Sequence, residues 1–264
     1  MSSVLWCDFE SRSRCDLKSK GVYNYARDGS TDVLCMSWAF DDEDVQTWLP
    51  GQPFPERVRN HTGQIRAHNA AFERLVFWYV LQIDFDLSQF YCTATQARAN
   101  CAPGSLEDVG RFFGASMRKD HRGGQLVRAL CIPRADGSFN DDPTLMAELV
   151  EYCETDVVAM RAVSLGMRQL SADELADYHV NERINDRGVL VDVPLARAAM
   201  RYAAAELDEI QKLVVRRRPV GVQRGQVRPH GRPGRRGGPA GARRVRVRRW
   251  RGDRAGIQLW SSSA

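Results

Sequence analysis

Five side chains in this sequence have types and surroundings suited to chemistry on a phosphate group: Asp8, Glu10, Glu73, Tyr152 and Asp156. Each of the four acids lies in an apolar segment, where an isolated charge loses hydration and needs a partner. Four carboxylates that lie close together can hold two divalent ions about 3.5–4 Å apart. Such a pair of ions stabilises both the attacking and the leaving oxygen in phosphoryl transfer. A nearby tyrosine hydroxyl can hold the attacking water or the scissile phosphate.

The first two acids end a short apolar segment, Val4 to Glu10, that reads as a buried strand. Side chains alternate between the faces of a strand, so Asp8 and Glu10 point the same way. Their repulsion calls for a cation, and a hard metal ion suits convergent carboxylate oxygens better than an arginine does. The alternative is a strand end whose two acids reach solvent.

Glu73 is expected on a helix that runs from Ala70 to about Gln82, with Asn69 as its N-cap. The apolar stripe of this helix consists of Phe72, Val76, Phe77 and Val80. Helical spacing puts Glu73 on that stripe and not on the solvent face.

The last two candidates share a second helix, which Asp142 caps and Pro143 opens. Asp156 again lies within an apolar stripe. Tyr152 is one turn before it, so the phenol and the carboxylate are neighbours.

The elements that must position these residues indicate an α/β fold. Short strands are predicted at residues 4–10, 33–40, 45–49, 64–67 and 90–92, and the first three have the spacing of antiparallel hairpins. Further helices are predicted from Ser105, from Ser171 to about Asp186, and from Pro194 to Val214.

Three of these segments resemble known motifs. Asp8-Phe9-Glu10, then the run from His68 to Glu73, then Tyr152-Cys153-Glu154-Thr155-Asp156 look like the exonuclease motifs of the DEDD 3′→5′ exonucleases, tyrosine subclass. The match is to the proofreading domain of phage-type family A DNA polymerases. The resemblance implies a ribonuclease H-like fold over residues 1–170, with a mixed five-stranded sheet flanked by helices.

The same resemblance implies function. Asp8, Glu10, Glu73 and Asp156 would bind two Mg²⁺ or Mn²⁺ ions, Tyr152 would position the nucleophile, and the substrate would be single-stranded DNA or a primer 3′ end. The second motif of the family usually ends in Asp. Because Glu is longer, we expect Glu73 to reach the second ion mainly through water and that ion to be held more weakly.

His68, Asn69 and Phe72 are candidate substrate contacts within the second motif. Each also has a structural interpretation: His68 as a histidine beside a helix start, Asn69 as an N-cap, and Phe72 as part of the apolar stripe. The charged run from Lys119 to Arg122 could contact phosphates or simply be a solvated loop.

The resemblance continues from Glu182 to Asp192, which is similar to the segment that joins the proofreading and polymerase domains. Residues 171–214 would then be a linker and the first thumb helices. The palm aspartate motif, the fingers helix and a His-Asp-Glu sequence are absent. We therefore expect a truncated polymerase without its synthetic site.

Charge divides the chain sharply at Val215. Residues 215–264 hold 15 Arg, no Lys and one Asp, whereas residues 1–214 hold 23 basic and 32 acidic side chains. The basic segment has no apolar periodicity, so we expect it to be disordered. We interpret it as the product of a frameshift after about residue 214; the alternative is an arm that follows nucleic acid backbone.

The sequence disfavours a membrane-spanning protein, a disulfide-stabilised secreted protein and a zinc finger. The sequence has no apolar run of transmembrane length, and its seven scattered cysteines form no C-x-x-C pair, which favours reduced thiols in a cytoplasm. Two alternatives to a DNA exonuclease stay open: an RNA-trimming exonuclease, and an inactive nuclease fold that only binds nucleic acid. The oligomeric state is not indicated.

Overall fold

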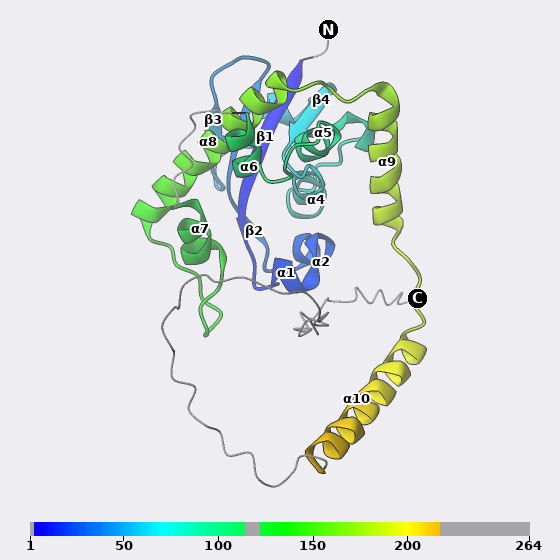
Figure 1. Ribbon diagram of the computed structural model, residues 1–264. Helices are drawn as coiled ribbons and strands as arrows, with labels where there is room; N and C mark the ends of the chain where they lie inside the picture. The colour runs from blue at the N-terminus through cyan, green and yellow to red at the C-terminus, as the bar shows by residue number, and fades with distance from the viewer. Residues whose placement is uncertain (1–2, 114–121, 217–264) are drawn as a thin grey trace, which may run out of the picture. The chain divides into compact units, whose positions relative to one another are not determined.

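The computed structural model describes residues 3–113 and 122–216, and Figure 1 labels their helices and strands. The chain divides into two units, Met1–Gly188 and Val189–Ala264. The basic segment beyond Arg216, with its expected disorder, lies outside the described residues, as do Lys119, Asp120 and His121.

The first unit contains a five-stranded mixed sheet in the order β3-β2-β1-β4-β5. β1 pairs with β2 and β2 with β3 in antiparallel register, whereas β4 runs parallel to β1 and β5 parallel to β4. The strands are β1 (Val4–Arg12), β2 (Asp32–Phe40), β3 (Gln46–Trp48), β4 (Gln64–Ala67) and β5 (Phe90–Cys92). This is a ribonuclease H-like fold, and it confirms the predicted fold class.

The helices and helical turns of this unit surround the sheet. They are α1 (Leu17–Lys20), α2 (Val22–Arg27), α3 (Glu56–Arg59), α4 (Ala71–Leu75), η1 (Val76–Val80), η2 (Leu87–Gln89), α5 (Thr93–Ala99), α6 (Leu106–Phe112), α7 (Gly123–Leu126), η3 (Val127–Cys131), α8 (Pro143–Gly166) and α9 (Ala172–Arg187). None of the described helices is long and apolar enough to cross a membrane.

The alternation of β1 places the core on both faces of the sheet. Trp6 packs with Val157 and Met160 of α8, while Leu5 and Phe9 belong to the cluster that contains the side chains of η1. α8 therefore covers one face of the sheet, and α4 with η1 covers the other.

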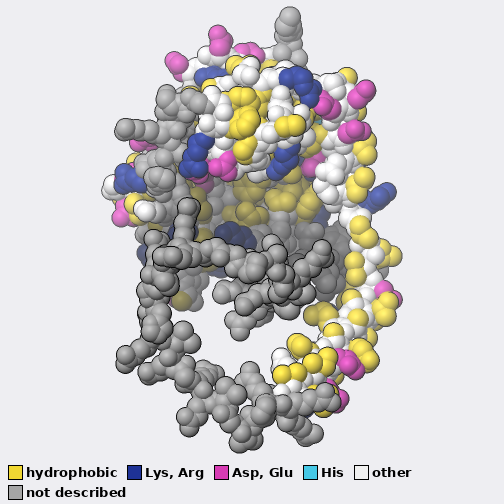
Figure 2. Space-filling model, viewed as in Figure 1, with side chains coloured by type: hydrophobic (Ala, Val, Ile, Leu, Met, Phe, Trp, Pro, Cys, Tyr) yellow, Lys and Arg dark blue, Asp and Glu magenta, His cyan; other side chains and the backbone are white. Residues whose placement is uncertain are grey.

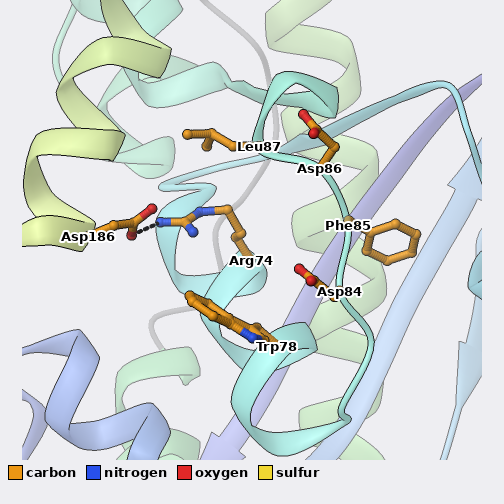
Figure 3. Close-up of a pocket in the computed structure, with 7 residues that line it drawn as sticks. All are labelled: Arg74, Trp78, Asp84, Phe85, Asp86, Leu87 and Asp186. Carbon is orange, nitrogen blue, oxygen red and sulfur yellow. Dashed lines mark hydrogen bonds and ion pairs between the residues drawn. The ribbon is translucent and has the colours of Figure 1, made fainter.

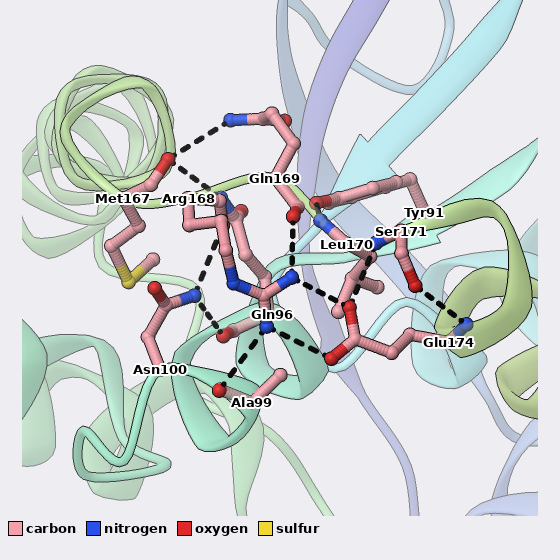
Figure 4. A network of polar contacts seen from close by, with 10 residues as sticks. All are labelled: Tyr91, Gln96, Ala99, Asn100, Met167, Arg168, Gln169, Leu170, Ser171 and Glu174. Carbon is pink, nitrogen blue, oxygen red and sulfur yellow. Dashed lines mark hydrogen bonds and ion pairs between the residues drawn. The ribbon is translucent and has the colours of Figure 1, made fainter.

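Two ion-pair networks hold α9 against the rest of this unit. Near its end, Asp186 accepts a hydrogen bond of 2.6 Å from Arg74 of α4 (Figure 3). Glu182 lies 3.5 Å from the same guanidinium. At its start, Glu174 pairs with Arg168 and completes a capping box with Ser171 (Figure 4). The first network is buried and the second is exposed.

In the second unit the described structure is α10 (Val193–Arg216), close to the predicted helix. Yellow apolar side chains line this helix in Figure 2. Met200, Leu207, Ile210 and Val214 are spaced by seven, three and four residues, and each is more than half exposed. This spacing makes one continuous apolar stripe.

Candidate functional site

β1 places Asp8 and Glu10 on one face, as its alternation predicts. Both are half-buried, and Phe9 between them points into the core with 4% exposure. The pairing of β1 with β4 ends at Trp6 and Arg66, although β1 continues against β2 beyond Glu10. In the described part of the chain, the edge of β1 beside the two carboxylates is therefore free of a strand, and the segment after β4 can approach them.

Glu73 comes from α4, in the segment that follows β4. Its side chain is buried, with 2% exposure for the residue, as the helical pattern predicts. Within the described residues, its Oε2 atom has no hydrogen-bond partner. Burial raises the pKa of Glu73 well above its usual value, and the charge of Asp8 raises it further. Among the described residues, the Glu73 carboxyl group thus has a buried oxygen atom that accepts no hydrogen bond.

The predicted N-cap at Asn69 is wrong. The residue before α4 is Ala70, and Asn69 has a φ of +68°. An N-cap residue needs an extended backbone, whereas Asn69 is in the left-handed region, which asparagine tolerates better than most residues. Its carbonyl accepts a hydrogen bond of 2.8 Å from Phe72 N. Asn69 therefore makes the turn between β4 and α4.

The predicted helix to about Gln82 is also interrupted. α4 ends at Leu75, and a wider π-helical turn, η1, continues from Val76 to Val80. Single π-helical turns of this kind are frequent near functional sites.

α8 carries Tyr152 and Asp156 one turn apart. Burial raises the pKa of Tyr152, and the charge of Asp156 and a hydrogen bond to it raise that pKa further. Cys153 between them is buried, and its Sγ lies 3.4 Å from Asp8 Oδ2. α8 thus brings its two candidate residues to the carboxylates of β1.

Most of the candidate residues line one pocket of about 430 Å³. It is lined by all four carboxylates, Asp8, Glu10, Glu73 and Asp156, and by the three candidate substrate contacts, His68, Asn69 and Phe72. Tyr152 is not among the lining residues in the described part of the chain. Across residues 3–113 and 122–216, no three His, Cys, Asp or Glu side chains are placed closely enough to hold a metal ion.

His68 has a structural role that its position predicts. Its Nδ1 lies 3.0 Å from Thr93 Oγ1, and its Nε2 lies 3.0 Å from the carbonyl oxygen of Gly104. Both ring nitrogens therefore have partners in the protein, and the ring ties the site to α5 and to the turn before α6. Of the charged run after Met117, Arg122 pairs with Glu148 at 2.8 Å.

Sequence reasoning missed several residues of this region. Leu17, Val22 and Ala71 also line the pocket, and they lack a chemical signature. Gly123 touches the ring of Tyr152 so closely that an added Cβ would lie 2.3 Å from Tyr152 Cε2. The pair Gly123-Gly124 was the available signal, but it reads first as a loop.

Comparisons with known proteins relate the chain to one phage protein. No family model matches the sequence. The chain is 29% identical over 231 residues to the DNA polymerase of Bacillus phage SP02, a match that covers 80% of this chain and 36% of that polymerase. The chain thus spans about a third of its relative. This similarity supports a region related to a phage DNA polymerase.

Proposed function

We propose that this chain is a metal-dependent 3′→5′ exonuclease that hydrolyses DNA phosphodiester bonds, of the proofreading type. The observation that carries the proposal is the single pocket lined by four carboxylates from β1, α4 and α8. The similarity to a phage DNA polymerase agrees with a nucleic acid substrate, which we take to be single-stranded DNA or a primer 3′ end.

The role of each acid in this proposal follows from the chemistry of its carboxylate oxygens. Asp8, Glu10 and Asp156 would supply hard oxygen ligands to one Mg²⁺ or Mn²⁺ ion, and Asp8 with Glu73 would help hold a second. The lone Oε2 of Glu73 fits this role, because a buried carboxylate oxygen without a donor suits a cation. The ions would supply a nucleophile at neutral pH and neutralise charge on the phosphate.

Protein side chains would do the rest. The Tyr152 hydroxyl would orient the attacking water, His68 would hold the wall of the pocket, and Phe72 and Asn69 would contact the terminal nucleotide. Hydrolysis adds water across the bond between the phosphorus and the 3′ oxygen of the preceding nucleotide. It therefore releases a nucleoside 5′-monophosphate and leaves a shortened strand with a 3′ hydroxyl.

A second candidate is a nuclease fold that binds nucleic acid without cleaving it. The observation in its favour is that the described acids include no set of three positioned for one metal ion.

A cleavage assay separates the two functions. The full chain is incubated with 5′-labelled single-stranded DNA in Mg²⁺ or Mn²⁺, and with EDTA as the metal-free control. We expect stepwise loss of 3′ nucleotides that stops in EDTA and in Asp8→Ala and Asp156→Ala. Asp44→Ala, an exposed acid outside the pocket, is the matched control.

The size of the loss decides the assignment. Loss of a ligand should lower the rate by more than about a hundredfold, equivalent to about 2.7 kcal/mol. Binding of DNA without any metal-dependent cleavage would favour the non-catalytic module. An RNA strand of the same sequence, cleaved faster than the DNA, would assign the enzyme to RNA trimming.

A further inference from the structure

We propose that a second pocket, beside α1 and α2, binds phosphates of the nucleic acid strand upstream of its 3′ end. The inference rests on the proposed function, because it gives the substrate strand a path away from the carboxylates. This basic pocket has a volume of about 600 Å³ and is lined by Arg14, Asp16, Lys20, Asn24, Arg27 and Asp28, among others.

The two acids of the basic pocket, Asp16 and Asp28, accept hydrogen bonds from residues close to them in the sequence. Asp16 caps α1 and accepts a hydrogen bond of 3.2 Å from Lys18 N. Asp28 Oδ1 accepts hydrogen bonds of 2.9 Å from Ser30 N and 2.6 Å from Ser30 Oγ. A side-chain hydrogen bond with Ser19 and the bond from Lys18 N lower the pKa of Asp16, and the two bonds from Ser30 lower the pKa of Asp28.

The three cations mainly contact neutral groups, although the charge of Arg14 contributes to the lowered pKa of Asp28. Arg14 donates from Nε to the carbonyl oxygen of Gly137 at 3.0 Å, and Arg27 donates to the hydroxyl of Tyr79 and lies 4.7 Å from its ring centroid. No carboxylate of the described chain lies within 4.0 Å of the charged nitrogens of Arg14, Lys20 or Arg27. The guanidinium groups are thus held in place by neutral partners and keep donors for an anion.

The basic pocket adjoins the carboxylate pocket through two short helices. Leu17 of α1 and Val22 of α2 line the carboxylate pocket, while Lys20 and Asn24 of the same helices line the basic one. α1 and α2 are four and six residues long, or about 6 and 9 Å. A strand whose 3′ end enters the carboxylate pocket can therefore cross these helices and place upstream phosphates beside the three cations.

The test measures binding in EDTA, so that cleavage plays no part. Fluorescence anisotropy of a labelled single strand of about ten nucleotides is followed against salt concentration for the full chain. The variant combines Arg14→Gln, Lys20→Gln and Arg27→Gln. A matched control removes three exposed charges outside both pockets and outside α1 and α2, with Arg59→Gln, Arg183→Gln and Arg187→Gln.

The expected difference follows from counterion release. Each neutralised phosphate of a single strand adds about 0.7 to the slope of log K against log salt, so the pocket variant should lose about 2 from that slope. The control should lose much less. The remaining basic charges of the chain are the same in both variants, so they do not contribute to the difference between them. Equal slopes for the two triple variants would overturn the proposal.

A chemical scan of the strand adds a second criterion. Replacing one phosphate at a time by a neutral methylphosphonate should weaken binding of the unmodified protein at upstream linkages, and the pocket variant should be insensitive at those same linkages. A flat scan in the unmodified protein would contradict the proposal. A flat scan combined with weaker binding of free dAMP to the pocket variant would also contradict it. That combination would show that the basic pocket binds the released nucleotide and not the strand.

These outcomes are independent of catalysis. A chain that shows the slope and the linkage effects but never cleaves DNA would refute only the proposed exonuclease. A chain that cleaves DNA without either effect would refute only the basic pocket.

Discussion

Replacing Arg74 by methionine should destabilise the first unit strongly, because Arg74 is the cation of a buried network. Its side chain is 7% exposed, that of Glu182 is 7% exposed, and that of Asp186 is 26% exposed. Methionine keeps most of the side-chain volume, so the substitution mainly removes charge. Glu182 would then lose its cation, while Asp186 would keep the 2.6 Å hydrogen bond from Tyr23.

The magnitude follows from this geometry. Removal of one partner from a fully buried ion pair costs about 3–5 kcal/mol. The 3.5 Å separation of Arg74 and Glu182 and the partial exposure of Asp186 place the expected loss at the lower end, about 3 kcal/mol. For an m-value of about 2 kcal/mol per molar, the urea midpoint should fall by about 1.5 M.

Tryptophan fluorescence during urea unfolding measures this loss, because Trp6, Trp38 and Trp48 are buried in the first unit. Arg168→Met is the matched control at the other end of α9. The side chains of Arg168 and Glu174 are 51% and 38% exposed, so water and salt screen that pair and its removal should shift the midpoint far less.

A second substitution tests the cause. Glu182→Met added to Arg74→Met removes the uncompensated carboxylate and should recover more than half of the loss, since hydrophobic replacements of buried pairs are often neutral. Equal midpoint shifts for Arg74→Met and Arg168→Met would refute the reasoning. So would a double variant no more stable than Arg74→Met alone.

The remaining predictions concern the carboxylate pocket and use cleavage of labelled single-stranded DNA. Tyr152→Phe should lower kcat with little change in the metal concentration required, because it removes only the hydroxyl; an unchanged kcat when chemistry limits the rate would make Tyr152 a packing residue. Gly123→Ala should lower kcat in the same way by displacing the Tyr152 ring, whereas Gly124→Ala, where an added Cβ meets nothing within 4 Å, should not. Glu73→Ala should lose less activity than Asp8→Ala and recover partly at high Mn²⁺; equal loss at every metal concentration would make Glu73 a direct, essential ligand.

Local periodicity is enough to predict which strand and helices hold the candidate site residues. The period of two in β1 puts Asp8 and Glu10 together, and the period of three to four in the helices buries Glu73 and sets Tyr152 beside Asp156. These patterns depend on neighbours within one or two turns, so the sequence contains them fully.

Features that depend on distant partners were missed. The end of the β1–β4 pairing at Trp6, which opens the edge of β1, has no local signal. α7 begins at Gly123-Gly124, which reads as a loop, yet it forms a helix because Leu126 packs against Leu130 and Leu149. Asn69 is favoured both as an N-cap and as a left-handed residue, and the position of α4 against the sheet decides between them.

The contact between α8 and β1 determines when the candidate site can assemble during synthesis of the chain. Cys153 touches Asp8 from 145 positions further along the chain. At about 5–20 residues per second, the ribosome needs about 7–30 s to make the intervening chain. Through that interval a nascent chain displays Asp8 and Glu10 without Tyr152 or Asp156. The proposed site therefore cannot assemble on an incomplete chain, and the carboxylates of β1 stay hydrated until α8 arrives.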